Sequence, residues 1–310
     1  MALDADTLLD RVQMKQSLMR WRTLAILALV LVGVILINRQ IGDNVVINDY
    51  VARVEINGVI EDDYYRTERL DRLAKNDSVQ AVLVSINSPG GTAVGGESLY
   101  HALQRISKEK PVVILMRDLC ASAGYMTAIG GDYLIAREGT LTGSVGVIMQ
   151  TLEVTELAKS WGIEPIIIKS GDNKASPNPA EKLTPERRQM VETVVADFFR
   201  FFNALVVKER GLNAEQQALI RDGRIFTGHQ ALEAGLVDAL GGEKEAMAWL
   251  EKEHDIDAES EIRTFNLVKE NNSLFGNLNQ SMEWLAKQTA NFSHRLDGLQ
   301  AIWQFDADSL

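Results

Sequence analysis

The chain has 310 residues, of which 46% are hydrophobic and 24% are charged, so it can bury a substantial core and is not compositionally disordered. Six prolines and a single cysteine, Cys120, exclude a proline-rich array, a collagen-like repeat and a small disulfide-stapled fold. The net charge of −11 argues against binding to nucleic acid, because phosphate backbones repel an acidic body.

An apolar run near the N-terminus predicts a membrane anchor. Residues 24–37 read LAILALVLVGVILI, and the flanking residues can extend this run toward the roughly 20 residues that span a bilayer. The basic residues before the run have no acid among them: Arg11, Lys15, Arg20 and Arg22. The positive-inside rule therefore places the N-terminus in the cytoplasm. A cleaved signal peptide is the alternative, but Leu36, Asn38 and Arg39 stand where a peptidase would need small residues.

These features predict the organisation of the chain. We expect a cytoplasmic segment at 1–22, a transmembrane signal anchor at 23–42, a globular domain at 43–250 and a C-terminal extension at 251–310. The N-terminal position of the apolar run and its flanking charges favour an anchor over a buried core helix. Everything after the anchor is then expected on the extracytoplasmic side of the membrane.

Beyond the anchor, short apolar runs alternate with amphipathic stretches, a pattern typical of an α/β domain with a largely parallel sheet. The strands that we expect are 51–56, 81–86, 112–116, 133–136 and 165–168. The helices that we expect between them are 68–75, 93–108, 121–129 and 154–161. Thr184 can cap a helix and Pro185 fits a first helical turn, so a long helix is expected from there to Glu209.

Ligands of parallel α/β sheets bind beyond the carboxyl ends of the strands, and two such places carry small residues. After the strand 81–86 comes Asn-Ser-Pro-Gly-Gly at 87–91, where consecutive glycines can turn backbone N–H groups toward a ligand, as in an oxyanion hole; an ordinary turn has the same composition. After the strand 112–116, Ser122 lies among small residues at a strand-to-helix junction. Ser122 is therefore a candidate nucleophile, with a packing site or a helix cap as the alternative.

A nucleophilic serine needs a base. No histidine lies between Ser122 and residue 228, which disfavours a Ser-His-Asp arrangement, and the four in the chain are His101, His229, His254 and His294. Lys174 follows the predicted strand 165–168, and a lysine can act as a base when burial keeps it uncharged; most loop lysines are simply solvated. No HExxH, CxxC or EF-hand sequence is present, so we expect no metal and no cofactor.

Five motifs in this order resemble the signal peptide peptidase A family. They are Asn-Ser-Pro-Gly-Gly (87–91), Ala-Ser-Ala-Gly-Tyr (121–125), Gly-Thr-Leu-Thr-Gly-Ser-Val-Gly-Val (139–147), Ser-Gly-Asp-Asn-Lys (170–174) and Thr-Gly-His-Gln-Ala-Leu-Glu-Ala-Gly-Leu-Val-Asp (227–238). The match covers roughly residues 50–245 and fits the short, unduplicated form of the family. The resemblance implies a Clp/crotonase-like fold in a bacterial inner-membrane Ser/Lys peptidase, with its catalytic domain on the periplasmic side.

The resemblance also implies roles for single residues. Ser122 matches the family's nucleophile and Lys174 its general base. Ser144 matches a serine that holds the lysine amine, and the backbone N–H groups of Gly91 and Ala123 match the oxyanion hole. The chain departs from the family pattern at two of its positions: Ala123, where glycine is more common, and Ala175, where an acidic residue is common.

The function that the resemblance implies is degradation of hydrophobic, membrane-associated peptides such as cleaved signal peptides. Membrane lipid, through the N-terminal helix, and further copies of the chain in a ring are the other expected partners, and nucleic acid is not expected. Three alternatives stay open: a Clp-like Ser-His-Asp protease, a crotonase-like coenzyme A enzyme and an inactive membrane-anchored scaffold. An extracytoplasmic domain argues against the coenzyme A enzyme, because acyl-CoA is cytosolic.

Overall fold

The computed structural model describes residues 21–22, 24–30, 49–267 and 300–302. The chain divides into two units, Met1–Asn48 and Asp49–Leu310. Among the described residues, no helix combines the length and the apolar character that crossing a membrane requires. The predicted anchor at 23–42 lies outside the described residues except for 24–30.

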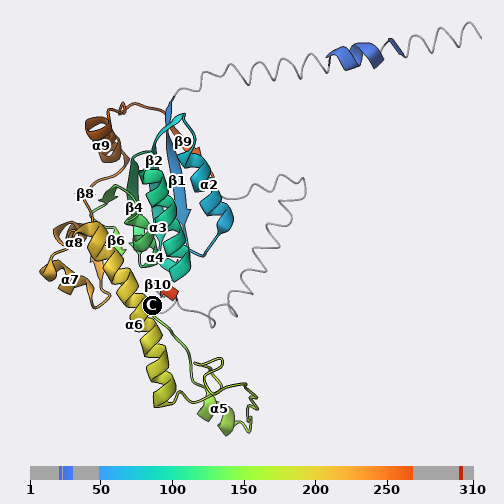
Figure 1. Ribbon diagram of the computed structural model, residues 1–310, viewed down its shortest axis with the longest axis vertical. Coiled ribbons are helices and arrows are strands. Elements are labelled where there is room, and N and C mark those ends of the chain that lie inside the picture. The colour runs from blue at the N-terminus through green and yellow to red at the C-terminus, as the bar shows by residue number, and fades with distance from the viewer. Residues whose placement is uncertain (1–20, 23, 31–48, 268–299, 303–310) are drawn as a thin grey trace, which may run out of the picture. The chain divides into compact units, whose positions relative to one another are not determined.

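The second unit is built on a mostly parallel sheet (Figure 1). Its strands are β1 Tyr50–Asn57, β2 Val79–Ser88, β4 Val112–Ala121, β5 Tyr133–Ala136, β6 Leu141–Gly143, β7 Ile225–Thr227, β8 Ala239–Leu240 and β9 Ile262–Phe265. They lie in the order β7-β6-β4-β2-β1-β9, and β5 pairs with β4 and β8. Only the β6–β7 pair of this sheet is antiparallel among the described strands. The expected α/β class with a largely parallel sheet is confirmed.

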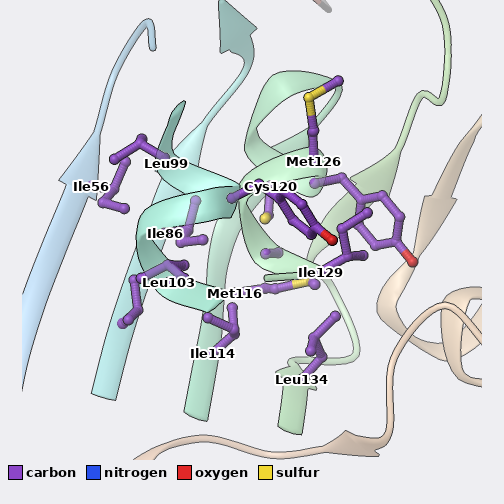
Figure 2. Close-up of a cluster of buried hydrophobic side chains, with 14 of the residues drawn as sticks. Ile56, Ile86, Leu99, Leu103, Ile114, Met116, Cys120, Met126, Ile129 and Leu134 are labelled. Carbon is purple, nitrogen blue, oxygen red and sulfur yellow. The ribbon is translucent and has the colours of Figure 1, made fainter. Parts of the chain in front are cut away.

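Helices bury both faces of the sheet because alternate side chains of each strand point to opposite sides. On one face, Val82 and Val84 of β2 join a large apolar cluster with α2 Tyr64–Ala74, α3 Ala93–Ser107 and α4 Ala123–Ala128. Figure 2 shows the part of this cluster where Leu103 of α3 and Ile86 of β2 lie together. On the other face, Ala81 and Leu83 pack with α9 Glu243–His254.

The long predicted helix is present as α6 Pro185–Arg210. The hydroxyl of Thr184 accepts a hydrogen bond from the backbone N–H of Arg187, and Pro185 occupies the first turn. Gly211 ends the helix in a left-handed conformation with φ 60°. The C-terminal half of α6 packs on the core through Phe202 and Val206, which are fully buried. The shorter helices are α5 Thr155–Ser160, α7 Ala214–Ile220 and α8 Gly228–Glu233.

One predicted element is wrong. Residues 165–168 form no strand, and the side chains of Ile166 and Ile168 are 90% and 94% exposed. No described strand pairs with this segment, so its apolar run has no sheet to join. It belongs to the projecting arm, residues 148–183, which includes α5 and lies beside the outer end of α6 (Figure 1).

Two other predictions need new bounds. The helix expected at 121–129 begins only at Ala123, because Ala121 still pairs in β4. The helix expected at 68–75 begins at Tyr64, where the carboxylate of Asp63 accepts hydrogen bonds from the backbone N–H groups of Tyr65 and Arg66.

The core placement of α3 gives a direct test. Leu103 is fully buried, whereas Leu219 on α7 is 41% exposed. Leu103→Ala should lower the free energy of unfolding by about 2–5 kcal/mol, because it leaves a cavity in the core. Leu219→Ala should lower it by less than about 1 kcal/mol. Urea unfolding followed by circular dichroism measures both, and equal losses would contradict this packing.

Candidate active site

Ser122 lies at the junction between β4 and α4, in a strained backbone conformation with φ 55° and ψ −119°. A positive φ at a non-glycine residue costs about 1–3 kcal/mol and persists only where its surroundings enforce it. Here the backbone N–H of Ser122 donates to the carbonyl of Gly143 at 2.9 Å, and its own carbonyl accepts from the N–H of Met126 at 2.8 Å. These bonds hold the turn that presents the Ser122 side chain.

A bulge in β4 directs the chain into this turn. Ile86 of β2 pairs with Met116, but Ser88 pairs with Cys120, so β4 has two more residues than β2 over this stretch. The side-chain carbonyl of Asn87 accepts a hydrogen bond from the N–H of Leu119 inside the bulge at 3.2 Å. Bulges of this kind often re-aim a side chain next to an active site. The asparagine of the Asn-Ser-Pro-Gly-Gly motif thus stabilises the approach to Ser122.

Ser144 is brought beside Ser122 by the pairing of β6 with the end of β4. Ala121 lies opposite Gly143 in this parallel pair, so the two serines follow neighbouring strand ends. Ser144 also has a positive φ, 50°, and its N–H donates to the carbonyl of Arg224 at 2.9 Å. The buried hydroxyl of Thr142 donates to the carbonyl of Cys120 at 2.6 Å and ties the two strands together.

Both serines line one cavity of about 610 Å³. Residues 145–147 and one face of α6 form much of its lining, and the turn 221–223 and parts of the arm, including Pro177 and Leu183, complete it. Most of the α6 side chains on this face are apolar, and they include Val191, Val195 and Phe199. Sequence reasoning missed α6 as part of the site, because residues three and four apart on a helix equally signal packing against a core.

Gly91 and Ala123, the two predicted oxyanion donors, lie on elements that contact each other, β3 Gly90–Thr92 and α4. A Cβ atom on Gly91 would lie 1.8 Å from the carbonyl oxygen of Ile60, so only glycine fits there. Strand β10 Gln300–Ile302 lies antiparallel along β3, with Ala301 opposite Gly91. Ala123 is fully buried at the first position of α4.

Lys174 is not brought to Ser122 within one chain. Lys174 is exposed on the projecting arm, and its backbone N–H donates to the carbonyl of Gly171 at 3.1 Å. It is not among the residues that line the cavity. The structure therefore brings Ser122 and Ser144 together and places Gly91 and Ala123 on touching elements, but it leaves the predicted base on the arm.

Other candidate groups do not enter the cavity. None of the three described histidines lines it, and the ring nitrogens of His101 and His229 face glutamates on exposed helix surfaces. Burial raises the pKa of the Cys120 thiol, so it stays protonated and cannot act as a nucleophile at neutral pH. Among the described residues, no group of three or more His, Cys, Asp and Glu is placed to hold a metal ion.

Comparison with known proteins places this site in a family. Residues 104–257 match peptidase family S49. A protein named as a protease in Methanocaldococcus jannaschii is 34% identical over 216 residues, which cover 70% of this chain and 69% of that protein. A protein of Enterococcus faecium named as signal peptide peptidase SppA is 30% identical over 220 residues, 66% of this chain and 64% of that protein.

Two further matches are more distant or partial. Protease 4 of Haemophilus influenzae is 30% identical over 181 residues, which cover 58% of this chain and 29% of that protein. A solved structure, a mutant of the membrane-bound stomatin-specific protease 1510-N, is 19% identical with a TM-score of 0.45, over 71% of this chain and 98% of its own. Together with the matched family residues, the similarity to the Methanocaldococcus jannaschii protein shows that the chain belongs to peptidase family S49.

Proposed function

We propose that the chain is a membrane-anchored serine endopeptidase that cleaves hydrophobic peptides such as cleaved signal peptides. The observation that carries this proposal is the strained Ser122 at the end of β4, beside Ser144 and on the wall of a largely apolar cavity. A serine held in a sharp strand-to-helix turn presents its hydroxyl to a cleft, as a nucleophile must. The apolar run at 24–37 supports the anchor.

The chemistry requires a base and an oxyanion hole. The Ser122 hydroxyl attacks the peptide carbonyl carbon while its proton moves to the uncharged amine of Lys174, and the N–H groups of Gly91 and Ala123 stabilise the negative oxygen. The protonated lysine then gives the proton to the leaving amine as the C–N bond breaks. Water hydrolyses the remaining acyl-enzyme ester by the same proton route and restores Ser122.

Lys174 reaches Ser122, in this proposal, from a neighbouring copy of the chain. The projecting arm that carries it exposes several large apolar side chains, including Trp161 at 73%, Ile166 at 90% and Ile168 at 94%. A monomer seldom leaves so much apolar surface in water, so the arm is suited to pack on another copy. Packing there would also exclude water from Lys174 and favour its uncharged form.

The substrate class follows from the cavity and from the relatives. The mostly apolar face of α6 in the cavity favours extended apolar peptides. Relatives named as signal peptide peptidase and as protease 4 support a peptide substrate. A domain outside the cytoplasm next to the membrane would meet signal peptides after they leave the secretion machinery.

The dyad gives the first test of this proposal. Ser122→Ala and Lys174→Ala should each abolish hydrolysis of a hydrophobic signal peptide, because each removes a group that takes part in bond breaking. Ser144→Ala should lower the rate less, because it only orients the lysine. Near-normal turnover in Lys174→Ala would remove the dyad, and an unchanged circular dichroism spectrum serves as the folding control.

A mixing experiment tests whether the base comes from another copy. When the inactive Ser122→Ala and Lys174→Ala variants are co-expressed, a site at a head-to-tail interface can combine an intact serine with an intact lysine. About a quarter of the sites in a random one-to-one mixture should then be complete, which gives about a quarter of the wild-type activity. A mixture as inactive as its components would show that each lysine serves its own chain.

The oxyanion role of Gly91 can be tested against a second glycine. Gly91→Ala must displace the backbone near Ile60, and loss of one oxyanion donor lowers kcat by about 10²–10³. Gly139→Ala is the control, because a Cβ atom there meets no atom within 4 Å. Equal kcat values for the two variants would contradict the assignment.

A further inference from the structure

The face of α6 that lines the cavity is arranged in two columns. Val191, Val195 and Phe199 form one column, in which successive members are four positions apart. Arg188, Glu192 and Ala196 form the other with the same spacing. Residues four apart on a helix lie on one side, so each column runs along the helix and faces the cavity.

The columns lead outward from the core. Phe202 and Val206 anchor the C-terminal half of α6 in the buried cluster, so Phe199 is the member closest to the core and Val191 the farthest from it. The projecting arm lies beside this outer half of the helix (Figure 1). The cavity between them reaches from the serines at the core along the outer turns of α6.

The spacing of these columns matches that of an extended peptide. Four helical residues advance about 6 Å along the helix axis. Two residues of an extended chain advance about 6.6 Å, and alternate side chains point the same way. Three successive members of a column can therefore meet three alternate side chains of one peptide without either chain bending.

We propose that α6 is the specificity-determining wall of the site, with Val191, Val195 and Phe199 each receiving one of three alternate side chains of an extended apolar substrate. This inference rests on the proposed function, since it takes the cavity to be the peptide site. It sets the required apolar stretch at about five residues, the length of extended chain that spans three alternate positions.

The second column limits the apolar stretch. Ala196 leaves room beside Val195 and Phe199, whereas Arg188 and Glu192 bring charges to the outer end, where their side chains are 64% and 66% exposed. Apolar contact is therefore greatest over the inner turns of α6, and charge and water begin at the level of Val191, beside Glu192.

Two neighbouring valines provide a matched test. Val195 is half-buried and lines the cavity, whereas Val194 is 38% exposed and does not. In the full-length Ser122→Ala background, which cannot cleave, an end-labelled leucine–alanine peptide is titrated and its Kd is measured by fluorescence anisotropy. Val195→Asp should weaken binding about tenfold, because it places a charged carboxylate against an apolar peptide. Val194→Asp should leave the Kd unchanged.

A lysine scan of the same peptide tests the register. One lysine position should restore binding to Val195→Asp by pairing with the new carboxylate, and that position should shift by about two residues when the aspartate is placed at Val191 instead. A gain of this kind cannot come from misfolding. Equal weakening by Val194→Asp and Val195→Asp, or no position that restores binding, would overturn the inference.

The binding measurement is independent of catalysis. If the peptide binds in this register but Ser122 does not cleave it in the unmodified chain, the proposed peptidase function fails and the specificity wall stands. If the unmodified chain cleaves the peptide but neither valine position changes the Kd, the peptidase function stands and the wall is wrong.

Discussion

The hydrogen bond from the N–H of Ser122 to the carbonyl of Gly143 holds together the part of the molecule on which the site depends. It continues the parallel pairing of β4 and β6 by one residue beyond the end of β4, where a strand would otherwise be free to leave the sheet. Because Ser144 follows Gly143 directly, the same pairing fixes the second serine. The turn at Ser122 after β4 and the turn at Ser144 after β6 therefore form as one unit.

The rest of the sheet supports this unit from both sides. The bulge in β4, held by Asn87, lets the strand end rotate without breaking its pairing with β2. On the far side, β7 pairs antiparallel with β6 and supplies the backbone next to Arg224, whose carbonyl accepts from Ser144. Three strands thus contribute to the position of two hydroxyl groups, and the large apolar cluster under α3 and α4 keeps those strands in place.

The elements that could be predicted from sequence are those with enough residues to show a period. The strands at 51–56, 81–86, 112–116 and 133–136 and the long helix are in place, because each buries a face that the sequence pattern reveals. Strands β3, β6 and β7 were not predicted, since three residues show no alternation. Residues 165–168 have the composition of a strand. Strand formation also requires a neighbouring strand to pair with, and the local sequence does not show whether one is present.

The candidate site was predictable to the same extent. Ser122 could be identified because small residues at a strand-to-helix junction carry a local signal. Ser144 was named only through the family resemblance, because the short strand β6 that places it beside Ser122 was not predicted. The α6 wall could not be identified, because its spacing equals that of any packed helix. The position of Lys174 depends on where the arm lies, which the spacing of fifty-two residues after Ser122 does not determine.

At Ser122 and Ser144, the residue type that best suits the positive-φ backbone differs from the one that the proposed reaction needs. At both positions glycine would accept the backbone conformation with less steric cost, whereas serine carries the hydroxyl into the cavity. Substitution of either serine by glycine would relax the backbone, and selection for stability alone would accept it. Serine rather than glycine at both positions is the choice expected if the proposed reaction uses the two hydroxyl groups.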